Sequence, residues 1–157
     1  MLELKELKEQ IDQFLEQQMP SDIDQPTLAS SMEYSVNAGG KRLRPALTLT
    51  TVQIFGGQLN QNVMKASTAI ELLHTYSLIH DDLPAMDNDD LRRGKPTNHK
   101  KFGAGMATLA GDGLLTMAFQ WLTDNQLPTE TQAELTLALA KAAGPPGMVA
   151  GQARDIE

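Results

Sequence analysis

The densest group of residues able to do chemistry is an acidic segment near the middle of the chain. Residues 80–90 read HDDLPAMDNDD and directly follow an apolar stretch. Carboxylates this close repel one another, and a divalent cation relieves the repulsion. Oxygen ligands are those that magnesium prefers. The segment therefore predicts a magnesium site, with a solvated surface loop as the alternative.

A calcium-binding EF-hand does not explain this segment. Aligned from Asp87, it has Arg92 where the turn glycine of an EF-hand should stand. Pro84 prevents an unbroken helix, because proline removes a backbone donor and disturbs the preceding turn. The chain is therefore expected to bend after Asp82, which could swing Asp87 back towards Asp81.

Two groups of cations accompany the acidic segment. Arg92 and Arg93 follow it closely, and Lys41 and Arg44 stand in the segment GGKRLRP, residues 39–45. Arginine has forked donors that match phosphate oxygens, and free N–H groups at a helix N-terminus favour anions. Lys41 and Arg44 are therefore predicted to bind a diphosphate, although the P-loop spacing is absent. For Arg92 and Arg93, ion pairs with the neighbouring aspartates are the alternative to phosphate binding.

A histidine is predicted to share a helix face with the acidic segment. His74 lies seven residues before Asp81, which is about 20° of rotation on an ideal helix. A histidine in an apolar helix is often simply buried with its partners satisfied. The shared face nevertheless favours a role for His74 in the site.

The elements that must position these residues are predicted to be helices. Ala, Leu and Met recur throughout, aromatics make up 4% of the chain, and the apolar residues fall at helical spacing. No alternating run of β-branched residues predicts a strand, and residues 20–26 are predicted to form a loop. The expected helices cover residues 2–18, 27–38, 45–55, 63–82, 104–123, 128–143 and 148–157.

The composition excludes several classes of function. The chain of 157 residues has a net charge of −7, which argues against a nucleic-acid partner because phosphate backbones need basic surfaces. The absence of cysteine excludes disulfides, thiolate metal sites and cysteine nucleophiles. No segment resembles a signal peptide or the ~20 apolar residues of a membrane helix. We therefore expect no membrane insertion and a cytoplasmic location.

Taken together, these motifs resemble the trans-prenyl diphosphate synthase family. GGKRLRP, His74, DDLPAMDNDDLRRG and GMVAGQARDIE stand in the family's order and at about its intervals, from about residue 28 onward. The resemblance is to the N-terminal half of the bacterial members that make farnesyl diphosphate. It implies an all-α fold, the helical bundle of the isoprenoid synthases, truncated so that residues 1–157 are the N-terminal portion of a single domain.

The resemblance also implies an activity and a set of site residues. The full-length enzyme would be a prenyltransferase that condenses isopentenyl diphosphate with an allylic diphosphate, dimethylallyl or geranyl, with Mg²⁺ assisting ionisation. Arg92 would contact the allylic diphosphate, and Asp81 and Asp87 would be the magnesium ligands. The implied catalytic residues are Asp81, Asp82 and Asp87. The implied ligands of isopentenyl diphosphate are Lys41, Arg44, His74 and Arg93.

Tyr76 and Ser77 bear on the product. They stand five and four residues before Asp81, and this pattern resembles synthases whose product is farnesyl rather than geranylgeranyl diphosphate. A geranylgeranyl diphosphate synthase is the close alternative. Tyr76 packed in an inter-helix core, with no contact to the product, is the structural alternative.

Two readings from other classes stay open. A non-catalytic prenyltransferase-like subunit would usually lose the aspartates or the basic ligands, and this sequence keeps both. A terpene cyclase would bind one diphosphate and would not need the segment GGKRLRP.

The family's second aspartate-rich motif is absent from these residues, so the chain alone is expected to be inactive. The full-length form is expected to be a homodimer. Arg154 stands where the family usually has an apolar residue, which weakens Gln152 and Asp155 as candidates.

Overall fold

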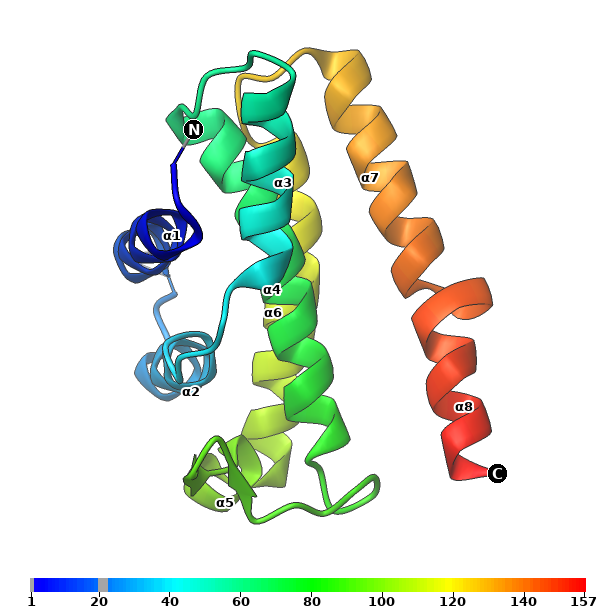
Figure 1. Ribbon diagram of the computed structural model, residues 1–157. Coiled ribbons are helices and arrows are strands. Elements are labelled where there is room, and N and C mark those ends of the chain that lie inside the picture. Colours follow the sequence, from blue (N-terminus) through cyan, green and yellow to red (C-terminus); the bar gives the residue numbers. More distant parts are fainter. Residues whose placement is uncertain (1, 20–22) are drawn as a thin grey trace.

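The structure, a computed structural model, describes residues 2–19 and 23–157; residues 20–22 of the predicted loop lie outside this part. The described chain is mostly helical (Figure 1), which confirms the all-α prediction. In chain order the elements are α1 (Leu4–Gln18), α2 (Pro26–Val36), α3 (Leu43–Ile54), α4 (Gln61–Asp81), β1 (Leu91–Arg92), β2 (Lys95–Pro96), α5 (Asn98–Phe102), α6 (Ala104–Thr123), α7 (Thr129–Ala143), η1 (Pro145–Val149) and α8 (Ala150–Ile156).

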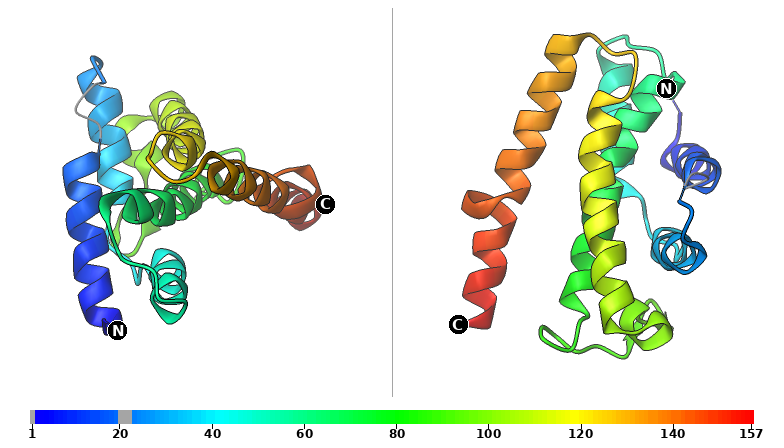
Figure 2. Two further views of the ribbon diagram at one scale, coloured as in Figure 1. Left: turned by 90° about the horizontal axis from the view of Figure 1, so that it is seen from above. Right: turned by 180° about the vertical axis from the view of Figure 1, so that it is seen from behind.

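Helices α4 and α6 form the centre of the molecule. They lie side by side along most of their length, α3 lies beside α4, and α1 and α2 cross them at one side (Figures 1 and 2). The close approach of α6 depends on small residues, because small side chains let two helix backbones come together without voids. The buried residues of α6 include Ala107, Ala110, Gly111 and Ala118.

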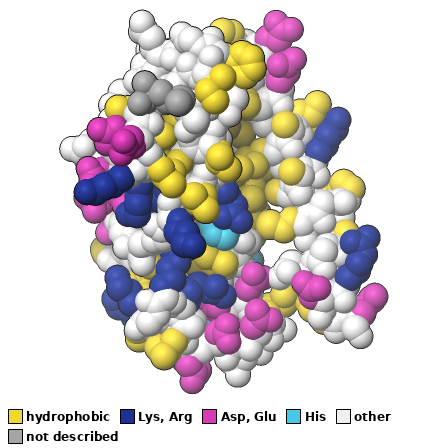
Figure 3. Space-filling view, in the orientation of Figure 1, with side chains coloured by type: hydrophobic (Ala, Val, Ile, Leu, Met, Phe, Trp, Pro, Cys, Tyr) yellow, Lys and Arg dark blue, Asp and Glu magenta, His cyan; other side chains and the backbone are white. Residues whose placement is uncertain are grey.

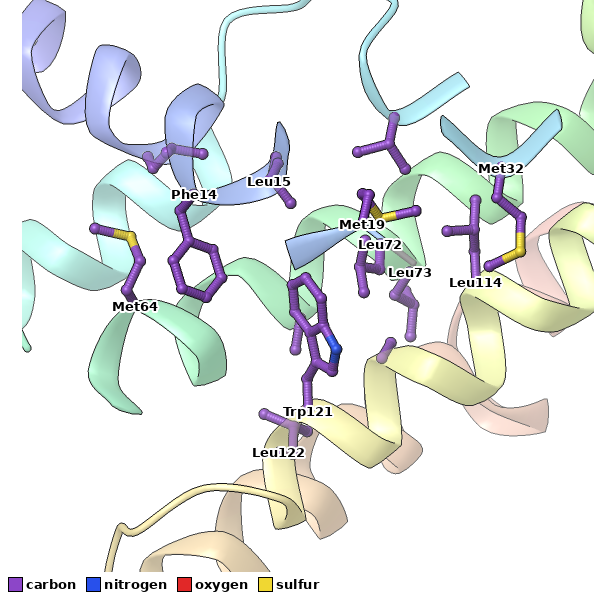
Figure 4. Packing of buried hydrophobic residues seen from close by; sticks show 14 of the residues in the cluster. Phe14, Leu15, Met19, Met32, Met64, Leu72, Leu73, Leu114, Trp121 and Leu122 are labelled. Carbon is purple, nitrogen blue, oxygen red and sulfur yellow. The ribbon is translucent and has the colours of Figure 1, made fainter. Parts of the chain in front are cut away.

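The core lies where α1, α2, α4 and α6 meet. Phe14 of α1 and Trp121 of α6 make an edge-to-face contact with ring centroids 5.8 Å apart (Figure 4). Leu15 and Leu72 are fully buried beside them. Burial of each such side chain stabilises the fold by roughly 1.5–3 kcal/mol relative to exposure. The core therefore fixes α4, the helix that leads into the acidic segment.

Helices α7 and α8 extend from the bundle as an arm whose backbone lies away from that of α4 (Figures 1 and 2). Leu137 of α7 and Ile156 of α8 are 55% and 66% exposed. The arm is interrupted at η1, where two prolines stand and where Gly147 leaves helical geometry at φ −111° and ψ −116°. Within the described residues, no helix combines the length and the apolar character needed to cross a bilayer.

The prediction that the chain has no strand is wrong at one place. Strands β1 and β2 form a two-residue antiparallel pair in which Leu91 faces Pro96 and Arg92 faces Lys95. The two residues between them, Arg93 and Gly94, have φ of 54° and 76°, the geometry of a type I′ hairpin turn. A strand of two residues is too short to show the alternation of polar and apolar residues by which a strand is predicted from sequence.

Candidate functional site

The acidic segment, residues 80–90, begins at the end of α4. Its bend after Asp82 agrees with the sequence prediction, because α4 ends at Asp81 and the chain then turns sharply. The backbone N–H of Asp87 donates to the carbonyl oxygen of Asp81 at 2.8 Å. The bend therefore brings Asp81 and Asp87 to the same place.

Their proximity has an electrostatic cost. Burial, followed by the charge of Asp87, raises the pKa of Asp81, and the nearby Arg92 offsets part of this. The described residues contain no group of three or more acidic or histidine side chains placed to hold a metal ion by themselves. Two carboxylates do fit magnesium, since this ion is usually held by one or two carboxylates together with substrate phosphates and water.

Asp82 lies differently from its neighbour. Its carboxylate is buried and accepts hydrogen bonds from Arg92: from Nε at 2.8 and 3.0 Å, and from Nη2 at 2.6 Å. The hydrogen bond to Asp82 raises the pKa of Arg92. The ion-pair alternative for Arg92 is thus the arrangement in the structure, and Asp82 holds strand β1 against the end of α4.

The four predicted isopentenyl diphosphate ligands come together. Lys41, Arg44, His74 and Arg93 line a single cavity between the basic loop, residues 39–45, and α4. Lys41 and Arg44 are exposed, while His74 is half-buried. Burial, followed by the charge of Arg44, lowers the pKa of His74. Arg42 and Glu71 also line the cavity, but they are paired with each other. Lys41, Arg44 and Arg93 therefore give the cavity an excess of positive charge, which suits an anion.

A buried arginine that the sequence did not single out supports the basic loop. Arg42 is 3% exposed and has the left-handed conformation, with φ 51° and ψ 29°. Its guanidinium donates to Asp12 of α1 at 2.7 Å, to Glu71 of α4 at 3.0 Å and to the carbonyl of Val36 at 2.7 Å. A signal existed in Glu71, since a carboxylate within an apolar helix needs a buried partner.

The hairpin is attached to the basic loop through Arg93. Its guanidinium donates to the carbonyl of Gly39 and covers Gly40 so closely that a Cβ there would lie 2.8 Å from Nη1. Gly40 also has φ +133°, which other residues rarely adopt. Neighbouring residues of one hairpin thus hold both parts of the site, Arg92 the end of α4 and Arg93 the basic loop.

Helix α8 contributes Gln152 to the site, although Arg154 departs from the family pattern two residues later. Gln152 donates a side-chain hydrogen bond to the carboxylate of Asp81, while Arg154 is exposed. The departure from the family pattern at Arg154 therefore does not stop Gln152 from reaching the acidic segment. Asp155 is exposed as well.

Figure 3 shows how these groups lie on one face of the molecule. Lys and Arg side chains gather around a histidine, Asp and Glu side chains lie below them, and a hollow separates the centre from the α7–α8 arm. Tyr76 lies on α4 five residues before Asp81, and burial, followed by the charge of Asp81, raises its pKa. Its ring is partly buried.

The chain is similar to a farnesyl diphosphate synthase, a geranylgeranyl pyrophosphate synthase and a geranyltransferase. Farnesyl diphosphate synthase of Geobacillus stearothermophilus is 60% identical over 133 residues, which is 83% of this chain and 44% of that protein. Geranylgeranyl pyrophosphate synthase 11 of Arabidopsis thaliana is 49% identical over 133 residues, covering 83% of this chain and 37% of that protein. A geranyltransferase structure from Legionella pneumophila superposes with a TM-score of 0.91 at 39% identity, over 97% of this chain and 54% of that one.

The chain spans about half the length of the relatives it matches, or less. The sequence also matches the family described as "Polyprenyl synthetase" over residues 25–157. This match includes the basic loop, the acidic segment and the hairpin. The chain therefore belongs to the polyprenyl synthetase family.

Proposed function

We propose that the full-length protein is a prenyltransferase that condenses isopentenyl diphosphate with dimethylallyl or geranyl diphosphate to give farnesyl diphosphate. The observation that carries the proposal is the cavity shared by Lys41, Arg44, His74 and Arg93 beside the Asp81–Asp87 pair. One region offers cations to a diphosphate, and the other offers carboxylates to a metal that holds a second diphosphate. Two adjacent diphosphate sites are what a head-to-tail condensation needs.

In this proposal Asp81 and Asp87 hold magnesium, which when bound supplies positive charge that stabilises the departing diphosphate. Gln152 orients Asp81 through its hydrogen bond. Arg92 is kept beside the allylic site by Asp82, so Asp82 acts by positioning rather than by direct contact. Its carboxylate is occupied by the arginine.

The basic cavity holds isopentenyl diphosphate and keeps its double bond close to the ionising centre. Lys41 and Arg44 neutralise its phosphate oxygens, and the neutral His74 donates or accepts a hydrogen bond there. Fixed cations placed where charge develops lower the barrier without reorganisation at the moment of reaction. The apolar walls of α4 and α6 exclude water from the reactive carbon.

Product length is proposed to depend on Tyr76. The residue lies little more than one helical turn before Asp81, on the helix along which a chain attached to the Asp81 site would grow. A bulky ring there stops the chain at farnesyl length, and the small Ser77 leaves room beside it. Geranylgeranyl synthase activity is the second candidate, favoured by relatives such as the Arabidopsis enzyme at 49% identity.

Several sequence predictions enter this proposal unchanged. The 157-residue chain by itself is inactive, because it lacks the second aspartate-rich motif. Its apolar arm also leaves the hollow open on one side (Figure 3). The full-length form is a homodimer in the cytoplasm. A non-catalytic subunit is disfavoured, since the aspartates and the basic ligands are all present.

Calorimetry with a bisphosphonate, an unreactive diphosphate analogue, tests the central claim in the full-length protein. Binding should require magnesium and should be lost in Asp81→Ala. Asp124→Ala, which changes an exposed carboxylate outside the acidic segment, is the matched control and should bind as the wild type does. Magnesium-independent binding, or unchanged binding by Asp81→Ala, would contradict the proposal. Turnover of labelled isopentenyl diphosphate by the isolated chain would contradict its inactivity.

A further inference from the structure

His80 is clamped between the two central helices. Its Nε2 lies 3.1 Å from the carbonyl oxygen of Thr108 on α6. A carbonyl can only accept, so this nitrogen carries the proton and donates. The same nitrogen lies 3.7 Å from a carboxylate oxygen of Asp112, which attracts that N–H dipole. The imidazole is therefore fixed in its orientation from the α6 side.

Gly111 makes room for this ring. A Cβ added at Gly111 would lie 2.2 Å from Nε2 and 2.4 Å from Cδ2 of His80. These distances are far below van der Waals contact, so any side chain at this position displaces the imidazole. The same α6 contains Gly105, where an added Cβ meets nothing within 4 Å. The position that faces His80 therefore needs a glycine, whereas the position of Gly105 does not.

The other side of the imidazole meets Tyr76. The two rings are in edge-to-face contact, with centroids 5.4 Å apart and planes at 86°. Tyr76 and His80 are one helical turn apart on α4, where side chains four residues apart are neighbours. A tyrosine ring in a partly buried site has two χ angles to fix, and this contact restricts them.

We propose that His80, clamped by Thr108 and Gly111, is a positioning residue that holds the Tyr76 ring and thereby limits product length. The inference rests on the proposed function, in which Tyr76 stops the growing chain. His80 does not contact the reacting atoms. Because α6 holds His80 in place, His80 in turn fixes the Tyr76 ring that borders the product. Gly111, which makes room for the imidazole, is therefore a specificity-determining position.

The first test measures dephosphorylated products of the full-length protein by chromatography. His80→Ala should raise the ratio of products longer than farnesyl by roughly 2- to 12-fold, the range expected when one aromatic pair contact is lost. His80→Phe, which keeps an aromatic ring beside Tyr76 but loses the hydrogen bond to Thr108, should lengthen the products less than His80→Ala does. In a Tyr76→Ala background, His80→Ala should add no further change.

Gly111→Ala disturbs the same contact from the α6 side and leaves the sequence of α4 unaltered. The displaced imidazole no longer supports Tyr76, so products should lengthen as in His80→Ala. Gly105→Ala is the matched control and should leave the distribution unchanged.

The outcomes separate the two claims. A wild-type protein that makes no prenyl diphosphate overturns the proposed function. A wild-type protein that makes farnesyl diphosphate overturns only the role of His80 if the distribution is unchanged in both His80→Ala and Gly111→Ala. Equal lengthening by His80→Ala with and without Tyr76 also overturns that role, because His80 would then act independently of the ring.

Discussion

The basic loop and the acidic segment are neighbours in the site, yet they are held in different ways. The basic loop is supported from beneath by Arg42, whose charge is buried and bonded to three separate helices or their ends. In the acidic segment, Asp87 is exposed and repels the Asp81 carboxylate beside it. The protein thus completes the first region with its own contacts, whereas in the proposed function the second is completed by a cation and a diphosphate.

The two regions differ because binding an anion and binding a metal place different demands on the structure. A region that binds an anion through fixed cations gains from rigidity, because no reorganisation is needed when the ligand arrives. A region that binds a metal through substrate oxygens must stay open until both arrive. The hairpin joins the two regions through Arg92 and Arg93, so the open region keeps a fixed distance from the rigid one.

The largest effect is expected on stability, when the support of the basic loop is removed. Arg42→Met should lower the free energy of unfolding of the chain by about 3–5 kcal/mol, because it leaves Glu71 buried without its partner. Urea unfolding followed by circular dichroism measures it. Arg154→Met, at an exposed position, is the control and should change stability by less than about 0.5 kcal/mol. A small effect of Arg42→Met would mean that water reaches Glu71 and that the loop is not anchored as described.

The next effect concerns ligand binding alone. Arg44→Ala in the full-length protein should weaken isopentenyl diphosphate by about 1.5–3 kcal/mol, the contribution of a charge-assisted hydrogen bond. Its effect on the allylic substrate should be far smaller. Separate titrations with the two substrates measure the difference, again with an Arg154 variant as control. Equal weakening of both substrates would assign Arg44 a structural role.

A smaller effect depends on pH. The pKa of His74 lies below its ordinary value of 6.5 in the folded chain, because of burial and then the charge of Arg44, with Arg92 and Arg93 adding to it and Glu71 opposing. The unfolded chain therefore binds the proton first as the pH falls. Stability should be unaffected by His74 above that value and should decline below it, with a slope that is a fraction of about 1.4 kcal/mol per pH unit.

Urea titrations between pH 7.5 and 5, at about half-unit steps across the histidine range, measure this slope. His74→Gln should flatten it, since glutamine cannot take up a proton. His99, which is buried on α5, supplies the matched variant His99→Gln for comparison. An unchanged slope in His74→Gln would mean that other groups cause the acid dependence.

The smallest effect is expected in the acidic segment. Without magnesium, Asp87→Asn should change the free energy of unfolding by less than about 0.5 kcal/mol, because the residue is exposed. With magnesium and pyrophosphate, a rise in the melting temperature of the wild-type protein should disappear in Asp87→Asn. Asp124→Asn, far along the chain, should keep that rise. Strong destabilisation of Asp87→Asn without metal would contradict the contrast between the two regions.

Much of this arrangement follows from sequence, and the rest depends on contacts that sequence does not encode locally. Helical spacing predicts the bundle, and Pro84 predicts the bend that returns Asp87 to Asp81. From the sequence, Arg92 could either bind a phosphate or pair with a neighbouring aspartate. Only the geometry of the hairpin shows that it pairs with Asp82. The hairpin itself rests on the backbone of Arg93, a residue that seldom has positive φ.

Arg42 illustrates the limit most clearly. In the printed sequence it stands between two cations that line the cavity, and nothing in its type or spacing sets it apart. Its role depends on Asp12 and Glu71, which lie 30 residues before it and 29 after it. Glu71 indicates that a buried partner is needed, but Arg42 is seen to be that partner only when the helices are placed in space.

The same spacing has a consequence for the chain during its synthesis. Asp12 and Val36 are translated before Arg42, but Glu71 follows it by 29 residues. Until Glu71 has left the ribosome, burying the Arg42 guanidinium would leave its charge with too few partners, which is unfavourable. We therefore expect the first three helices to reach their final arrangement only after Glu71 has left the ribosome, so that the basic loop is fixed late and together with the helix that carries His74.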